Sequence, residues 1–254
     1  MKKSFIILLL SICFVMNAQL KQVDYSDDIQ KLSGFVATPK KGLKNKAAVL
    51  ILPAWMGIDD HAKESALELQ KLGYFAFVAD IYGVDKRPKN TNEAGMIATY
   101  YKTNISDYHR RIQLALDQLV KKGANPDKIV VIGYCFGGTG AIESARMNMK
   151  VQGIVSFHGG LGRDAARKIS AITPKVLVLH GADDFYVPVY EIEAFQNEMR
   201  KANADWQMTY YSNSVHAFTH KDAGNDNSKG AAYNEKAEKR SWIAMNDFLK
   251  EILN

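Results

Sequence analysis

The amino-acid sequence predicts an α/β fold, a doubly wound and mostly parallel sheet with helices on both faces. From about residue 34 onward, short apolar and β-branched runs alternate with longer stretches of helical periodicity. Residues 47–52 are apolar throughout, as expected for a strand that helices cover on both faces. Because parallel strands require crossover connections, this order places the functional site at the carboxyl ends of the strands.

The expected strands are short and are separated by turn residues or by amphipathic stretches. They span residues 35–38, 47–52, 74–79, 129–134, 151–157, 176–180 and 206–211. The first helix is well delimited, because Asp59 and Asp60 precede it and Gly73 follows its last apolar residue. Further helices are expected as a pair over 92–121 and singly over 138–149, 190–201 and 232–252.

The N-terminal residues predict a secretory signal peptide over residues 1–18. Lys2 and Lys3 precede an apolar run over 5–16, and Ala18 offers a cleavage site. The run is too short to span a bilayer comfortably, although an uncleaved N-terminal anchor is the alternative. We therefore expect an exported protein, periplasmic or secreted, without stable membrane association after cleavage. The remaining residues, 19–254, contain no repeat or linker and predict one domain.

The composition indicates a folded protein rather than a disordered or nucleic-acid-binding one. Of the 254 residues, 47% are hydrophobic and 24% are charged, which supports a full core. The net charge is +6, and the lysines are spread along the chain. The local lysine cluster at residues 40–46 lacks aromatic or arginine-rich neighbours, so a solvated turn is the better interpretation.

The sequence contains two cysteines, Cys13 and Cys135. Cys13 lies in the expected signal peptide, so Cys135 is the only cysteine of the mature chain and has no disulfide partner there. A lone thiol in an exported protein is expected to be either buried and inert or used for chemistry.

The residues around Cys135 predict a nucleophile elbow. An apolar strand leads into Gly-x-Cys-x-Gly, and a helix of small residues follows. Gly133 and Gly137 provide the clearance that a strained strand-to-helix turn needs. The helix N-terminus favours a thiolate and, later, an oxyanion. The alternative is a glycine-rich turn after a core cysteine.

Chain order then indicates the partners of Cys135. In such a fold an acid and then a histidine follow the nucleophile, each after a later strand. Asp183 and Asp184 are the two candidates for the acid, and His216 is the histidine with both the right order and a loop setting. Cys135 would attack an acyl carbon, His216 would shuttle the proton, and the acid would orient the imidazole.

Backbone N–H groups are expected to stabilise the oxyanion. One belongs to Phe136, the residue after the nucleophile, and Trp55 in the loop after an early strand is the candidate for the other. The side chain of Trp55 is alternatively a hydrophobic wall. His158 and His180 lie at strand ends near the same edge, where they either line the site or make structural hydrogen bonds.

These segments together resemble the dienelactone hydrolase family. The resemblance is carried by Leu-Pro-Ala-Trp-Met-Gly at 52–57, Asp-Ile-Tyr-Gly at 80–83, Gly-Tyr-Cys-Phe-Gly-Gly at 133–138, Ser-Phe-His-Gly-Gly at 156–160, His-Gly-Ala-Asp-Asp at 180–184 and Val-His-Ala-Phe at 215–218. It implies one α/β-hydrolase domain, a Cys-Asp-His triad with Asp184 as the acid, no cofactor or metal, and hydrolysis of lactones or related esters.

Two departures from the family pattern concern the substrate. Members that act on dienelactone carry a glutamate where Ala54 stands, and an arginine where Val84 stands. Activation of the thiol is therefore expected to depend on His216 and the helix terminus alone. Tyr82, Arg87 and His158 are the candidate substrate-binding residues.

The sequence thus predicts a hydrolase that cleaves a small carboxylic ester or lactone through Cys135. A thioesterase or a broad carboxylesterase is the alternative within the same chemistry. A catalytically silent α/β-hydrolase fold that binds a small ligand is the alternative of another class. The physiological substrate and the oligomeric state are left open.

Overall fold

The computed structural model describes residues 20–40 and 45–253, so the expected signal peptide and Cys13 lie outside the described residues. One sheet of eight strands runs through the described chain in the order β1-β2-β4-β3-β5-β6-β7-β8. The strands are β1 (Lys21–Asp27), β2 (Gln30–Ala37), β3 (Ala48–Leu52), β4 (Phe75–Val78), β5 (Ile129–Tyr134), β6 (Gly153–Phe157), β7 (Lys175–Gly181) and β8 (Trp206–Tyr211).

Strands β3 to β8 are mutually parallel, and β2 pairs antiparallel with β4 and with β1. The predicted α/β class with a mostly parallel sheet is therefore confirmed. Residues alternate between two hydrophobic clusters along each central strand, so that Leu50 and Leu52 face one side and Val49 and Ile51 the other. Both sides of the central strands are buried, which explains the uninterrupted apolar runs.

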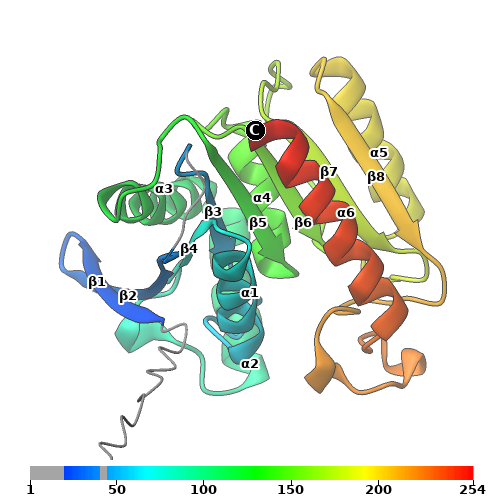
Figure 1. The fold of residues 1–254 in the computed structure, drawn as a ribbon. Coiled ribbons are helices and arrows are strands. Elements are labelled where there is room, and N and C mark those ends of the chain that lie inside the picture. The colour runs from blue at the N-terminus through cyan, green and yellow to red at the C-terminus, as the bar shows by residue number, and fades with distance from the viewer. Residues whose placement is uncertain (1–19, 41–44, 254) are drawn as a thin grey trace, which may run out of the picture.

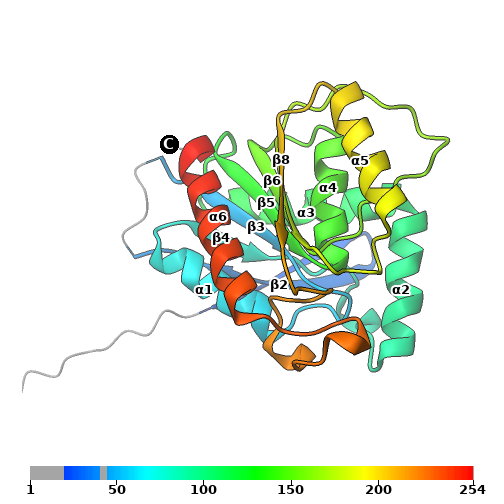
Figure 2. The same ribbon diagram turned by 90° about the vertical axis from the view of Figure 1, so that its right-hand side faces the viewer.

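Helices cover both faces of the sheet (Figures 1 and 2). Helices α1 (Asp60–Lys71) and α6 (Glu235–Leu253) pack on one face, and α2 (Thr91–Thr103), α3 (Ile105–Lys121), α4 (Phe136–Arg146) and α5 (Val189–Lys201) contribute to the cluster on the other. Three short 3-10 turns span Val84–Lys86, Lys221–Ala223 and Asn227–Lys229. As predicted, the side chain of Asp59 caps α1 by accepting the N–H of Ala62 at 2.8 Å.

The structure differs from the predicted elements at two places. Strand β1 and the first half of β2 were not predicted, because β1 is a mostly polar outer strand in which Val23 alone is buried. The chain reverses between these strands at Asp28, which has a φ of 50°. Helix α4 begins at Phe136, two residues before the predicted start, because the helix follows Cys135 directly.

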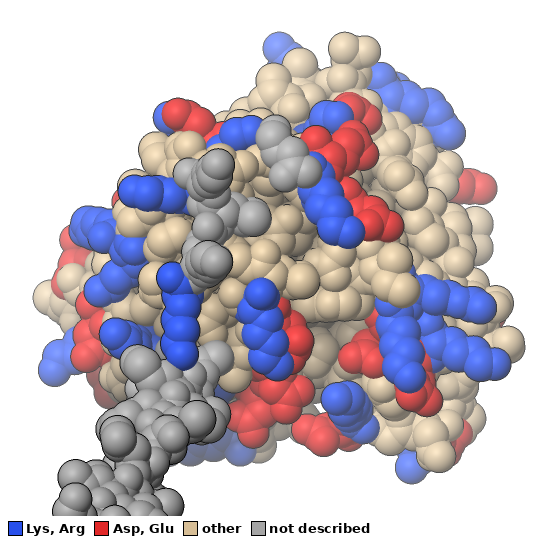
Figure 3. Space-filling model, in the orientation of Figure 1, with Lys and Arg blue, Asp and Glu red and all other residues tan. Residues whose placement is uncertain are grey.

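Charged side chains of both signs are interspersed on the face that carries α1 and α6 (Figure 3). This mixture agrees with the dispersed lysines of the sequence and forms no basic stripe on that face. Among residues 20–40 and 45–253, no helix combines the length and the apolar character that crossing a bilayer requires.

Candidate active site

Cys135 lies at the tip of a sharp turn between β5 and α4. Its backbone has φ 54° and ψ −112°, a conformation that residues other than glycine rarely adopt. A Cβ added to Gly133 would lie 1.9 Å from the carbonyl oxygen of Gly137, and one added to Gly137 would lie 2.1 Å from that of Leu52. The turn therefore requires glycine at both positions, as the elbow pattern predicted.

Cys135, His216 and Asp184 form one connected chain of side chains. The Sγ of Cys135 lies 2.9 Å from Nε2 of His216, and Nδ1 of His216 lies 2.9 Å from Oδ2 of Asp184. The carboxylate of Asp184 is fully buried, and its Oδ1 accepts the backbone N–H of Tyr186 at 3.0 Å. The neighbouring Asp183 is exposed, so the structure selects Asp184 from the two candidates.

The electrostatics of this group favour charge separation between sulfur and imidazole. Burial raises the pKa of the Cys135 thiol, but the charge and hydrogen bond of His216 and the N–H of Phe136 together lower it below its ordinary value. Burial lowers the pKa of His216, whereas Cys135 and Asp184 raise it to a net value of about 10. A thiolate beside an imidazolium is therefore the stabilised state.

The loop after β3 lies against the elbow and carries Trp55. The hydroxyl of Tyr82 donates to the carbonyl oxygen of Trp55 at 2.9 Å, and the Tyr82 ring packs 5.5 Å from the ring of Phe136. Tyr82 thus ties together the two residues predicted to supply oxyanion donors. Trp55 itself is 37% exposed, so its indole is accessible from solvent.

The structure places the three predicted substrate-binding residues in different surroundings. Tyr82 is buried and supports the Trp55 loop, and His158 is completely buried. The guanidinium of Arg87 donates to Oδ2 of Asp80 at 2.8 Å and to the carbonyl oxygen of Ser33 at 2.9 Å. These bonds, both from Nη2, hold β2 against the loop after β4, and the side chain stays 38% exposed.

Sequence reasoning missed a group of buried polar residues behind His216. This histidine cluster consists of His61, His158 and His220 around the hydroxyl of Thr219. The Oγ1 of Thr219 lies 2.8 Å from Nε2 of His158, 3.2 Å from Nδ1 of His220 and 3.4 Å from Nε2 of His61. The ring of His158 packs edge-on to His216 at 5.4 Å. No local signal marks the cluster, because its members come from α1, the end of β6 and the loop after β8.

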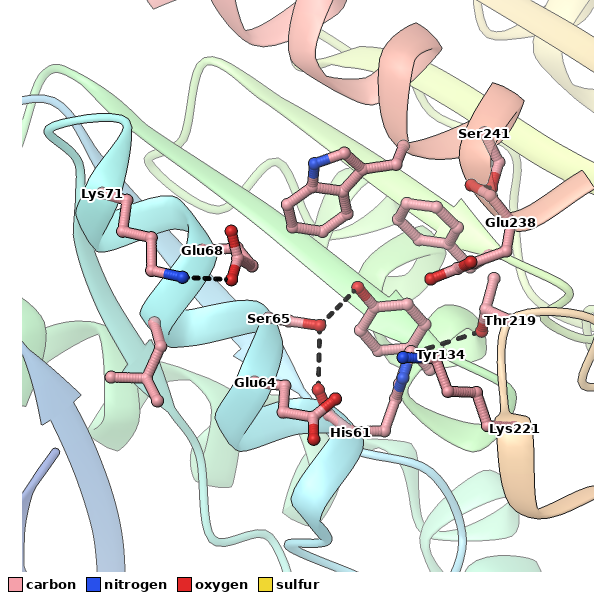
Figure 4. A pocket seen from close by; sticks show the side chains of 13 residues that line it. His61, Glu64, Ser65, Glu68, Lys71, Tyr134, Thr219, Lys221, Glu238 and Ser241 are labelled. Carbon is pink, nitrogen blue, oxygen red and sulfur yellow. Dashed lines mark hydrogen bonds and ion pairs between the residues drawn. The ribbon is translucent and has the colours of Figure 1, made fainter. Parts of the chain in front are cut away.

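A cavity of about 660 Å³ lies between α1 and α6 and borders the histidine cluster (Figure 4). Tyr134 and Phe157 are among the residues that line it, and His61 and Thr219 contribute to one side. Neither Cys135 nor His216 lines this cavity, so it is separate from the reacting groups. Within the described residues, no group of three or more histidine, cysteine or acidic side chains is arranged to hold a metal ion.

Comparison with known proteins assigns the family. The model of the dienelactone hydrolase family matches residues 32–253. The chain belongs to the dienelactone hydrolase family. The resemblance seen in the sequence is thereby confirmed, and this family member is a hydrolase of ester or lactone bonds.

Individual relatives agree with this assignment. The solved structure of m3DLH is 32% identical and superimposes with a TM-score of 0.87, covering 93% of this chain and 99% of that one. A dienelactone hydrolase-like promiscuous phosphotriesterase from metagenomic libraries is 35% identical, with a TM-score of 0.83 and the same coverage. A putative carboxymethylenebutenolidase of Yersinia pestis is 23% identical over 74% of each chain.

Proposed function

We propose that this hydrolase cleaves small carboxylic esters or lactones with Cys135 as the nucleophile of a Cys-His-Asp triad. The observation that carries the proposal is the unbroken connection from Sγ through the imidazole to Asp184, with both contacts at 2.9 Å. A binding module of this fold would not require a thiol with a lowered pKa on a strained turn. The carboxymethylenebutenolidase name of the Yersinia pestis relative supports a lactone or ester substrate.

In the first half of the reaction, the thiolate of Cys135 attacks the carbonyl carbon and forms a C–S bond. The N–H groups of Phe136 and Trp55 stabilise the oxyanion. His216, as imidazolium, donates its Nε2 proton to the alcohol oxygen as the C–O bond breaks. In a lactone the released hydroxyl stays attached to the acyl group.

In the second half, neutral His216 removes a proton from a water molecule, which attacks the thioester carbon. The C–S bond breaks, the acid product leaves, and the thiolate–imidazolium pair is restored. Asp184 holds Nδ1 of His216 throughout and stabilises its positive charge. Because Ala54 stands where dienelactone-cleaving members carry a glutamate, the thiolate forms here without a loop carboxylate.

Intact-mass analysis after mixing with activated esters tests the mechanism. The panel contains an aryl ester, a lactone and a thioester, and a single acyl group on Cys135 is the expected adduct. His216→Ala should retain the fold and be inactive, and Cys135→Ala should be inactive and carry no adduct. Full hydrolysis by Cys135→Ala would sink the mechanism, and iodoacetamide that labels Cys135 only after denaturation would contradict a reactive thiol.

We also propose that the protein is exported after removal of residues 1–18, because the charged, apolar and small-residue segments of a signal peptide occur there in order. The mass of the protein from the native cell envelope or medium should correspond to a chain beginning at Gln19. Recovery of the full-length chain from the cytoplasm would contradict export.

A further inference from the structure

Two exposed aromatic side chains form the rim of the site beside His216. Tyr186 is 57% exposed and Phe185 is 60% exposed, and their ring centroids are 4.8 Å apart. The ring of Tyr186 stands edge-on to the imidazole of His216, with 5.6 Å between centroids and an interplanar angle of 84°. Large apolar surface left open beside reacting groups marks a place where a ligand binds.

This aromatic rim has a defined position. The backbone N–H of Tyr186 is bonded to Asp184, so the loop is tied to the buried carboxylate. On the other side, a Cβ added to Gly230 would lie 2.4 Å from the ring of Phe185 and 2.8 Å from the hydroxyl of Tyr186. Because the loop is bonded to Asp184 on one side and the backbone at Gly230 lies close to both rings on the other, the rim is held in place before any substrate arrives.

The mechanism determines which part of the substrate meets the rim. His216 delivers its proton from Nε2 to the alcohol oxygen, so that oxygen must come within hydrogen-bond distance of Nε2. The group attached to the oxygen must then lie against the side chain that flanks His216, which is Tyr186. The acyl carbon lies at Cys135, and the oxyanion points toward Phe136 and Trp55.

The charges next to the rim favour a neutral alcohol portion, because they are of both signs. Asp183 is exposed in the same loop, and Lys229, next to Gly230 on the other side, is paired with Asp226 at 3.9 Å. Arg87, a substrate-binding candidate of the sequence, donates from Nη2 to Asp80 and Ser33. An aromatic group, in contrast, gains edge or face contacts with Tyr186 and Phe185.

We propose that the preferred substrates are esters with a neutral, aromatic alcohol portion, and that Tyr186 is the residue that determines this preference. The inference rests on the proposed function, because it takes the position of the leaving oxygen from His216. It narrows the substrate class from small esters in general to aryl or arylalkyl esters.

A comparison of benzyl acetate with ethyl acetate tests the proposal, since the two share an acyl group and both release a primary alcohol. The wild-type protein should hydrolyse benzyl acetate with a kcat/KM about tenfold above that for ethyl acetate. Tyr186→Ala should reduce this ratio to within about twofold of unity, mainly through benzyl acetate, and Tyr186→Phe should restore it. The backbone bond to Asp184 is retained in both variants.

Tyr190→Ala is the matched control. Tyr190 is a 73% exposed tyrosine at the start of α5, and in the described part of the chain its ring does not pack against His216. It should leave the ratio unchanged. The proposal is overturned if Tyr186→Ala keeps the benzyl preference, if both esters lose activity equally, or if 4-(acetoxymethyl)benzoate is cleaved faster than benzyl acetate. Cys135→Ala measured in parallel separates the two proposals, since hydrolysis by that variant rejects the mechanism rather than the substrate class.

Discussion

Two groups of ionisable side chains in this protein differ in how they are stabilised, one by hydrogen bonds and the other by ion pairs. The histidine cluster behind His216 gathers His61, His158 and His220 around the hydroxyl of Thr219, and the carboxylate of Asp59 lies 3.5 Å from Nε2 of His220. The second group, the arginine network, joins Arg146 on α4 to Glu143 on the same helix, to Glu198 on α5 and to the loop after β6. The arginine network consists of buried ion pairs, whereas the histidine cluster consists mainly of hydrogen bonds to Thr219.

The pKa shifts express this contrast. Burial, together with the neighbouring His220, lowers the pKa of His61 to about 3. Burial and the neighbouring histidines lower the pKa of His158 well below its ordinary value. Burial raises the pKa of Glu143, but hydrogen bonds from His109 and Arg167 and the charge of Arg146 bring it down to about 2. His61 and His158 are therefore held neutral, whereas Glu143 in the arginine network is held charged.

The positions of the two groups explain the difference. His216 alternates between imidazolium and neutral imidazole during the proposed reaction, and a charged neighbour in a low-dielectric site would shift its pKa strongly. Neutral hydrogen bonding holds His158 against His216 without adding such a field. Arg146, which donates 2.8 Å bonds to the carbonyl oxygens of Leu161 and Gly162, instead anchors a loop where no proton has to move.

Removing the centre of the arginine network should have the largest effect. Arg146→Met removes one cation from two buried carboxylates, leaving Glu143 with His109 and Arg167 and Glu198 with Arg163. We expect a loss of about 3–5 kcal/mol in the free energy of unfolding. Urea denaturation measures this loss. Lys239→Met breaks an exposed pair with Glu235, and the free energy of unfolding should stay close to that of the wild type. Equal losses in the two variants would remove the distinction between buried and surface pairing.

Removing the centre of the histidine cluster should have a smaller effect on stability and a visible effect on catalysis. Thr219→Val leaves Nε2 of His158 without its partner and should cost about 1–3 kcal/mol. If the cluster holds the imidazole of His216, the pH profile of kcat/KM should shift in Thr219→Val and stay unchanged in Arg146→Met under conditions where both are folded. A shift of the same size in both variants would show that the two groups act alike.

Acid should destabilise the two groups in different pH windows. In the unfolded chain His61 becomes protonated below about pH 6.5, whereas in the folded chain its pKa of about 3 keeps it neutral down to that pH. The free energy of unfolding therefore falls as pH falls through this range. Glu143 stabilises the fold above its unfolded pKa of 4.5, and this contribution is lost as pH falls toward 2. His61→Phe should therefore reduce the slope between pH 6.5 and about 3, while His158 maintains part of it and the loss due to Glu143 below pH 4.5 remains. Unfolding curves across this range, compared with the wild type, check both parts.

Much of the site was predictable because it depends on local geometry and chain order. Gly133 and Gly137 are required by contacts within the turn itself, and the same contacts expose the thiol of Cys135 on a strand-to-helix turn. The position of His216 after the last strand follows from the order of the parallel strands. The polar strand β1, which the hydrophobic pattern did not predict, is the outermost strand of the sheet and contributes no residue to the Cys135–His216–Asp184 group.

The sequence by itself determined the α/β class, the turn at Cys135 and the order in which acid and histidine follow, because steric clearance and strand order act along the chain. Its residues alone left two aspartates open, and the 2.9 Å contact with His216 selects Asp184. Only the tertiary structure placed Arg87 against Asp80 and gathered His61, His158 and His220 around Thr219. Those contacts join residues from separate elements, and no local pattern records which buried polar groups will meet when the elements pack.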